Sequence, residues 1–358
     1  MVTLLDCIER IPSILEGILQ NRRENMALFL SYLGDRANEL NEIIFVGSGT
    51  SSTTAMTSRI FVEQASGLAA KVCFPSDFCY HTASYNPKAL YVFTSQTGTS
   101  IITAKAQKLV QDMGLLSVSI TESEATPLAK AASSHINMGC GYEEYLMRTI
   151  GYTSSVLTHM LLGLELGLKR GNITQEQFDE YIGQAAMVPN SQRAIIQKTL
   201  AWMDKSKRQM LRSRAILFTG DGALYGVALE GAMKVWEIPQ ITCMGYELEE
   251  GLHGPNYGYD YGHCVIVLND GGRENNKALA LARYMKEVLH NGLVVGAQVV
   301  DDTDLAIELK GGAFNCLELS AVPQVIAYRL AVDGGRDLLA PHDNSRMESY
   351  FKTHGDTK

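Results

Sequence analysis

Runs of apolar, often β-branched residues alternate along the chain with longer segments in which apolar residues recur with a helical period. Short strands separated by helices are typical of βαβ units around a parallel sheet. In the first half the predicted strands span 42–46, 70–74, 89–93, 115–120 and 135–138, and the predicted helices span about 52–66, 99–113 and 148–169.

The same order of strands and helices returns in the second half. The strands predicted there span 214–218, 240–244, 264–268, 292–299 and 306–309, and the helices span about 222–237, 274–290 and 320–333. Gly47 and Gly220 are 173 residues apart (220 − 47 = 173), and Val92 and Ile266 are 174 apart (266 − 92 = 174). A separation this steady indicates an internal duplication. We therefore predict an α/β fold of two tandem, doubly wound parallel sheets with flanking helices.

Three domains follow from this pattern. Residues 1–34 are predicted to form an N-terminal helical arm, residues 35–190 the first sheet domain, and residues 191–358 the second sheet domain with a C-terminal tail. The charged segment 175–212, which has a helical period, predicts one or two connecting helices.

Composition narrows the classes of function. Of the 358 residues 46% are hydrophobic, enough for a large core, and the net charge of −8 comes with no block of five like charges. These features argue against a nucleic-acid partner. The longest uncharged run, 149–164, is too short and too polar to span a membrane, and the N-terminus does not resemble a secretory signal. Seven scattered cysteines predict reduced thiols. We expect a soluble, cytoplasmic protein with no structural zinc.

Candidate chemistry in the first half lies in two loops that follow strands. We call residues 47–54, Gly-Ser-Gly-Thr-Ser-Ser-Thr-Thr, the first hydroxyl loop, and residues 94–100, Thr-Ser-Gln-Thr-Gly-Thr-Ser, the second hydroxyl loop. In parallel sheets ligands bind beyond the carboxyl ends of the strands. Glycines, hydroxyls and a helix N-terminus together suit a phosphate group, although either loop alone also reads as an ordinary helix N-cap.

Other ligands for a glycine-rich turn fit less well. Neither loop contains the lysine of a Walker motif, and neither matches the G-x-G-x-x-G pattern of dinucleotide binding. Neither loop offers an acidic residue for magnesium. A monophosphate held by hydrogen bonds is therefore the favoured ligand, rather than a nucleoside triphosphate.

The second half has charged groups where the first has hydroxyls. Glu230, Lys234 and Glu237 are spaced by four and three residues, so they share one face of a predicted helix, as a surface ion pair would also do. His253 lies between Gly251 and Gly254, and before Pro255, in the loop that begins at Glu250. A histidine in such a loop is more often solvated than catalytic.

Taken together these segments resemble the sugar isomerase (SIS) domain family, which is found doubled in the isomerase half of glucosamine-6-phosphate synthase and in fructosamine-6-phosphate deglycases. Four motifs agree in order and spacing: Gly49-Thr50-Ser51 with C-G-T-S, 95–100 with S-Q-S-G-E-T, 229–237 with L-E-G-A-L-K-L-K-E, and 250–255 with E-L-K-H-G-P. The resemblance covers roughly residues 35–340. It implies two flavodoxin-like SIS subdomains, of which the first binds phosphate and the second carries the catalytic glutamate and histidine.

The resemblance also implies roles for individual residues. The residues that would hold the phosphosugar are Thr50, Ser51, Ser95, Gln96, Thr97, Ser100 and Thr149, with Glu230 and Lys234 as supporting residues of the site. Thr149, five residues after Glu144, is the weakest match because Ile150 replaces the family's lysine. Glu237 would move a proton between C1 and C2, and His253 would help to open the sugar ring across a dimer interface. Such proton transfer requires no metal and no other cofactor.

Departures from the family pattern favour one branch. The chain begins Met1-Val2-Thr3 without a glutaminase domain, so we expect that it does not make ammonia from glutamine as the synthase does. In the C-terminal tail Lys352 lies six residues after Arg346 instead of four, which leaves a Schiff-base role for this lysine in doubt and looks more like the deglycase branch.

We therefore predict an enzyme that cleaves a 6-phosphorylated ketosamine, an adduct of a fructosamine or glucosamine type, to glucose 6-phosphate and a free amine. An aldose–ketose isomerase or deaminase of an amino-sugar phosphate is the alternative enzyme. A non-catalytic regulator that binds phosphosugars is the alternative outside enzymes. The expected partners are a small-molecule sugar phosphate and other copies of the chain in a homodimer or higher homo-oligomer.

Overall fold

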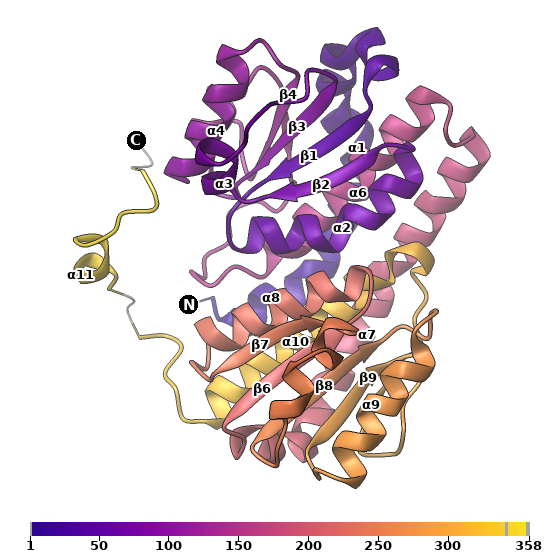
Figure 1. The fold of residues 1–358 in the computed structure, drawn as a ribbon, viewed down its shortest axis with the longest axis vertical. Helices are drawn as coiled ribbons and strands as arrows, with labels where there is room; N and C mark the ends of the chain where they lie inside the picture. The colour runs from indigo at the N-terminus through magenta and orange to yellow at the C-terminus, as the bar shows by residue number, and fades with distance from the viewer. Residues whose placement is uncertain (1, 341–342, 356–358) are drawn as a thin grey trace. The chain divides into compact units, whose positions relative to one another are not determined.

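The computed structural model describes residues 2–340 and 343–355. The described residues form two compact units, each with one five-stranded parallel sheet (Figure 1). The first-sheet unit comprises residues 14–143, 150–180 and the described part of 340–358. The second-sheet unit comprises 144–149, 181–339 and the described part of 1–13. The predicted α/β class of two parallel sheets with flanking helices is confirmed.

The first sheet has the strand order β2-β1-β3-β4-β5. This is the flavodoxin-like order, in which the chain switches direction between β1 and β3 and leaves a crevice at their carboxyl ends. The strands are β1 (Glu42–Val46), β2 (Ala69–Cys73), β3 (Ala89–Thr94), β4 (Ser117–Thr121) and β5 (His135–Asn137). The helices are α2 (Thr50–Ser66), α3 (Pro75–Tyr80), α4 (Ile101–Asp112), α5 (Pro127–Lys130) and α6 (Ile150–Arg170).

The second sheet repeats this topology. Its order is β10-β9-β8-β6-β7, so its switch point lies between β6 and β8. The strands are β6 (Ala215–Gly220), β7 (Cys243–Glu247), β8 (His263–Asn269), β9 (Gly292–Gly296) and β10 (Leu305–Ala306). The helices are α8 (Ala223–Glu237), α9 (Asn275–Glu287) and α10 (Asn315–Asp333). Matching strand orders at matching positions support the internal duplication inferred from the sequence.

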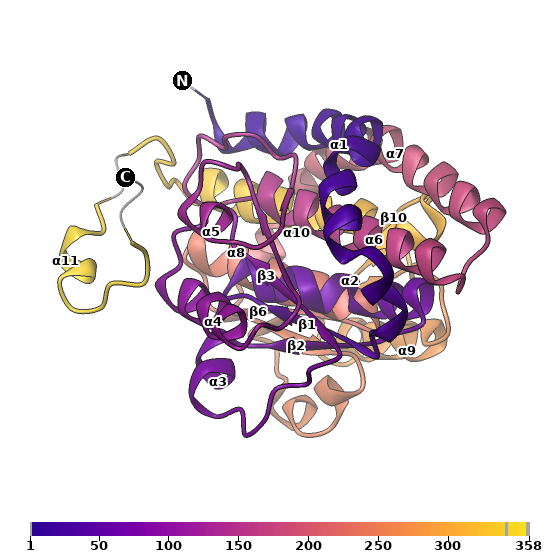
Figure 2. The same cartoon turned by 90° about the horizontal axis from the view of Figure 1, so that it is seen from above.

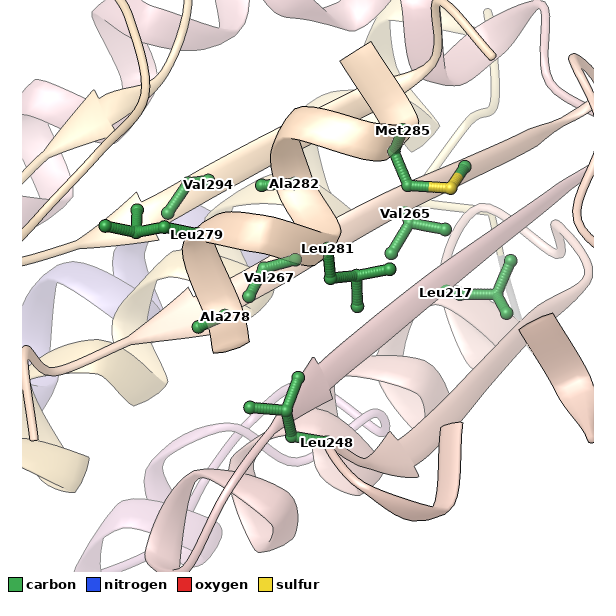
Figure 3. Close-up of a cluster of buried hydrophobic side chains, with 10 residues drawn as sticks. All are labelled: Leu217, Leu248, Val265, Val267, Ala278, Leu279, Leu281, Ala282, Met285 and Val294. Carbon is green, nitrogen blue, oxygen red and sulfur yellow. The ribbon is translucent and has the colours of Figure 1, made fainter. Parts of the chain in front are cut away.

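Helices cover both faces of each sheet. In the first-sheet unit, side chains of α3 and α4 pack against Tyr91 and Phe93 on one face, while α2 and α6 lie side by side on the other (Figure 1, Figure 2). In the second-sheet unit, α9 places Leu281 and Met285 against Val265 on one face (Figure 3). The opposite face is covered by α8 and α10. Because both faces of each sheet are buried, the strands are continuous runs of apolar residues in the sequence.

The remaining helices are α1 (Leu4–Leu33), α7 (Gln175–Leu211) and α11 (Ser345–Glu348). Helices thus occur in the segments predicted to form a helical arm and one or two connecting helices, and α7 is one continuous helix of 37 residues. The domain boundaries after residues 34 and 190 stay a prediction. No helix among the described residues is long and apolar enough to cross a membrane.

Several element boundaries differ from the predicted ones. The strand expected at 240–244 begins only at Cys243, because Gln240 adopts a positive φ of 59° in the turn that follows α8. The strand expected at 306–309 is only Leu305–Ala306. The short helices α3 and α5 were not predicted, although each begins with a proline, Pro75 and Pro127, as first turns of helices often do.

Candidate active site

The first hydroxyl loop connects β1 to α2 at the switch point of the first sheet. Gly49 has φ 58° and ψ −129°, a conformation that glycine adopts without strain, and it caps α2, whose first residues are Thr50 and Ser51. A Cβ on Gly47 would lie 2.7 Å from the Cβ of Ser51, so this position also requires glycine. The turn therefore brings the backbone close to the helix N-terminus, where N–H groups and the helix dipole favour an anion.

The second hydroxyl loop connects β3 to α4 beside the first, because β1 and β3 are paired neighbours. Ser95 is buried and its N–H donates to the carbonyl of Ile120 on β4. The hydroxyls of Thr97 and Thr99 lie 2.8 Å apart, and the hydroxyl of Ser100 lies 2.9 Å from that of Thr103. The sheet thus places the predicted residues Thr50, Ser51, Ser95, Gln96, Thr97 and Ser100 on two adjacent loops at one end of the first sheet.

Glu143 is a residue of this site that the sequence analysis missed. Its buried carboxylate accepts hydrogen bonds from Gln96 Nε2 at 3.2 Å, from the N–H of Ile150 at 3.0 Å and from the N–H of Gly151 at 3.2 Å. Glu143 therefore joins the second hydroxyl loop to the first turn of α6, where a negative charge is favourable. The available signal in the sequence was a carboxylate a few residues before a predicted helix.

Glu144 and Thr149 have other surroundings. Glu144 forms an ion pair with Arg10 within the second-sheet unit, and the hydrogen bond from Arg10 lowers the pKa of Glu144 to about 2. Thr149 is fully buried directly before α6, and its carbonyl accepts a hydrogen bond from Gln324 Nε2 at 3.2 Å. The role of Thr149 at a sugar stays a prediction.

The C-terminal tail returns to the second hydroxyl loop. His354 forms an antiparallel bridge with Ser100; the N–H of Ile101 donates to the carbonyl of Thr353 at 3.1 Å, and the N–H of Gly355 donates to the carbonyl of Thr99 at 2.8 Å. Lys352 directly precedes this paired segment and is exposed. The pairing places the backbone of the tail at the N-terminus of α4.

In the second-sheet unit, α8 carries a buried charge network. Lys234 Nζ lies 2.6 Å from Glu237 Oε2 and 3.4 Å from Glu230 Oε1. Glu230 and Lys234 are buried, whereas the side chain of Glu237 is 37% exposed. Burial alone would lower the pKa of Lys234, but the two carboxylates outweigh it and raise that pKa. Lys234 therefore stays charged, and its contact with Glu237 orients a side chain that also reaches solvent.

The loop after β7 carries His253. Its Nδ1 lies 2.9 Å from the carbonyl oxygen of Glu249 and 3.6 Å from the Glu249 carboxylate, which is also paired with Lys277. The carbonyl can only accept, so Nδ1 carries the proton and Nε2 is the basic nitrogen of the neutral ring. The side chain of His253 is 65% exposed, so the ring is accessible to a ligand.

Carboxylates gather at the carboxyl ends of β6, β7 and β8. Asp221 follows β6, Glu247 ends β7, and Asp270 follows β8. Burial, followed by the charge of Asp270, raises the pKa of Asp221. Gly222 has φ 56° and ψ −125°, almost the geometry of Gly49. The second sheet therefore repeats the backbone turn of the first with side chains that repel an anion.

The chain thus combines a doubled flavodoxin-like fold with two hydroxyl-rich turns at the switch point of its first sheet. Residues 38–164, which contain all five strands of the first sheet, match the SIS domain family model.

A curated relative is the glutamine–fructose-6-phosphate aminotransferase (isomerizing) of Bartonella quintana, which is 28% identical over 85% of this chain and 51% of its own length. The chain spans about half the length of the curated relatives it matches.

Two solved structures share the fold over nearly the whole chain. A Clostridium difficile protein assigned as a phosphosugar isomerase has a TM-score of 0.87 at 23% identity and covers 100% of both chains. The C-terminal domain of the glucosamine-fructose-6-phosphate aminotransferase of Francisella tularensis has a TM-score of 0.81 at 19% identity, covering 93% of this chain and 96% of that one. The predicted resemblance to the SIS family and to the isomerase half of the synthase is therefore confirmed at the level of the fold.

Proposed function

We propose that this chain is an enzyme that cleaves a 6-phosphorylated ketosamine to glucose 6-phosphate and a free amine. The observation that carries the proposal is Glu237, a partly exposed carboxylate held 2.6 Å from the buried ammonium of Lys234. A base that moves a proton between neighbouring carbons must be oriented and accessible; the contact with Lys234 supports its orientation, and the 37% exposed side chain supports its access to substrate. The two hydroxyl loops support recognition of the phosphate, away from the reacting carbons.

The reaction needs one proton relay and one water. Glu237 removes a proton from C1 of the open-chain ketosamine while the C2 carbonyl oxygen takes up a proton, which gives an enaminol with a C1–C2 double bond. Return of the C1 proton to C2 and loss of the amine N–H proton, which balances the proton taken up by the oxygen, give a C1 imine. Water hydrolyses this imine to the aldehyde of glucose 6-phosphate and the amine. No electrons enter or leave, so the proposal calls for no redox cofactor.

His253 is assigned to opening the sugar ring. Its Nε2 is the basic nitrogen when Nδ1 is bonded to the Glu249 carbonyl, and it can take the proton of the anomeric hydroxyl. Action of His253 in the site of a second copy, in a homodimer or larger homo-oligomer, belongs to the proposal.

The other predicted residues are assigned to binding. Thr50, Ser51, Ser95, Gln96, Thr97 and Ser100 are assigned to the phosphosugar, together with Thr149, Glu230 and Lys234. Lys352 is assigned to the same site, which the pairing of the adjoining residues 353–355 with the second hydroxyl loop supports. An arginine-to-lysine spacing of six residues in the tail favours a contact with substrate over a Schiff base.

The test is a coupled assay for glucose 6-phosphate released from a panel of 6-phosphorylated Amadori compounds. Glu237→Gln should lower kcat by about a thousandfold and leave phosphosugar affinity by calorimetry within about threefold of wild type, because the amide keeps the shape but loses the base. Glu287→Gln, an exposed carboxylate on α9, is the matched control and should keep full activity.

Other products would change the assignment. Release of ammonia from an amino-sugar phosphate, or a ketose formed from an aldose, would assign an isomerase or a deaminase to the same residues. Phosphosugar binding without turnover of any compound would contradict the enzyme and favour a regulator.

A further inference from the structure

His159 lies in the middle of α6, fully buried between the two elements that carry the hydroxyl loops. Its Nδ1 lies 3.1 Å from Ser58 Oγ on α2, and its Nε2 lies 2.9 Å from Thr94 Oγ1 on β3. The ring stacks on Phe45 of β1 with 4.5 Å between the ring centroids. One imidazole therefore contacts β1, α2 and β3 of the same unit.

The two hydroxyl partners of His159 adjoin the two loops. Thr94 is the last residue of β3 and the first of the second hydroxyl loop. Ser58 is on the helix that begins at Thr50, within the first hydroxyl loop. Because α2 and β3 carry the loops as rigid elements, a fixed link between Ser58 and Thr94 fixes the distance between the loops.

The second copy of the fold lacks this link at the same place. The offsets of the duplication put Gly231 at the position of Ser58 (231 − 58 = 173) and Leu268 at the position of Thr94 (268 − 94 = 174). A Cβ on Gly231 would lie 2.7 Å from the Cβ of Pro323 on α10, so apolar packing fills the space there. The fold by itself therefore does not require a polar link, and the link occurs in the copy that has hydroxyl loops.

The His159 ring is electrically neutral while it bonds to its two hydroxyl partners. Burial lowers the pKa of His159 to about 3, so one nitrogen donates to a hydroxyl and the other accepts from one near neutral pH. A buried pair of such bonds is directional, and neither hydroxyl can move without leaving a buried polar atom unsatisfied.

We propose that His159 is a positioning residue that sets the spacing between the two hydroxyl loops and thereby the affinity for the phosphate of the sugar. This inference rests on the proposed function of those loops. His159 makes no contact with substrate; it acts through Thr94 and Ser58.

The experiment compares three substitutions of His159 by calorimetry with fructose 6-phosphate. In His159→Gln the amide falls near the place of Nε2 and keeps the bond to Thr94, whereas in His159→Asn it falls near Nδ1 and keeps only the bond to Ser58. We expect His159→Gln to bind with a Kd within about threefold of wild type. We expect His159→Asn and His159→Leu each to have a Kd about tenfold higher than wild type. In the ketosamine assay KM should rise in the same order with kcat nearly constant.

Tyr152→Phe is the matched control, because it removes the 2.7 Å hydrogen bond between Tyr152 and Thr57 that also joins α2 to α6. It should lower thermal stability without changing Kd. If a His159 variant does not fold, Thr94→Val tests the same link from the β3 side and should weaken binding about tenfold.

Equal Kd values for the glutamine and asparagine variants, or a folded leucine variant that binds like wild type, would overturn the positioning role. Wild-type protein that does not bind fructose 6-phosphate would instead overturn the proposed phosphate site, and this inference with it.

Discussion

The two sheets share a backbone and differ in chemistry at the same place. Gly49 and Gly222 have nearly equal dihedral angles, and each turn joins the first strand of its sheet to the next helix. The first turn continues into Thr50 and Ser51, whereas the second contains Asp221 and continues into Ala223. A turn and a helix N-terminus thus make an anion site possible, and the side chains decide whether an anion is admitted.

The same contrast holds inside the helices that follow these turns. Glu230 and Lys234 on α8 stand where α2 has Thr57 and Phe61, at the constant offset of 173 (230 − 57 and 234 − 61). One copy thus carries charge in its interior and the other carries hydroxyls and an aromatic ring. Duplication kept the fold, and under the proposed function the first copy binds the phosphate while the second transfers the proton.

The largest effect is expected from Lys234→Met. It leaves the Glu230 carboxylate buried without its ammonium, which should cost about 3–5 kcal/mol in the free energy of unfolding, measured with urea. Adding Glu230→Gln should restore much of the loss, and the corresponding Phe61→Met should cost only about 1 kcal/mol. A loss below about 1 kcal/mol for Lys234→Met would show that the network is not needed for stability.

Exchanging the turns tests the contrast directly. Ser48→Asp gives the first turn the Gly-Asp-Gly sequence of the second, and a carboxylate about 6 Å from a phosphate should repel it by about 3 kcal/mol, or about a hundredfold in Kd at low salt. Asp221→Ser should leave Kd unchanged. Calorimetry with fructose 6-phosphate measures both, and an equal response of the two variants would contradict the division of roles.

Stability should depend on pH through His159. Its folded-state pKa of about 3 lies below the ordinary value of 6.5, so the unfolded chain binds the proton first as the pH falls. The contribution of the neutral ring is complete above about pH 6.5, and about 2 kcal/mol of it should be lost between pH 7 and pH 5. Urea unfolding of His159→Asn at the two pH values should lack this loss; an unchanged pH dependence would refute the assignment.

The smallest effect is expected from the turn glycines. Gly49→Ala and Gly222→Ala each force an alanine into a positive φ and should each cost about 1 kcal/mol in the free energy of unfolding. Only Gly49→Ala should also weaken phosphosugar binding. Similar losses of affinity in both variants would mean that the second turn contributes to the phosphate site.

Much of the fold could be predicted from the local pattern of apolar and polar residues. Periodicity predicted the strands and long helices of both sheets to within a few residues, because strands buried on both faces are continuous apolar runs. It failed at 240–244, where the positive φ of Gln240 delays the start of β7 to Cys243, although Pro239 directly before Gln240 was a local signal of a turn. The hydroxyl loops were recognisable because glycines and hydroxyls at a strand end are local features.

The amino-acid sequence by itself determined the duplicated α/β fold, the order of its elements and the loops that carry the candidate chemistry, since these depend on residues near one another in the chain. Only the tertiary structure decided which distant groups meet: Glu143 with Gln96, the tail with Ser100, and His159 with both Ser58 and Thr94. Such contacts depend on how helices pack across a sheet. Burial then shifts the pKa of the groups that meet, as it does for His159.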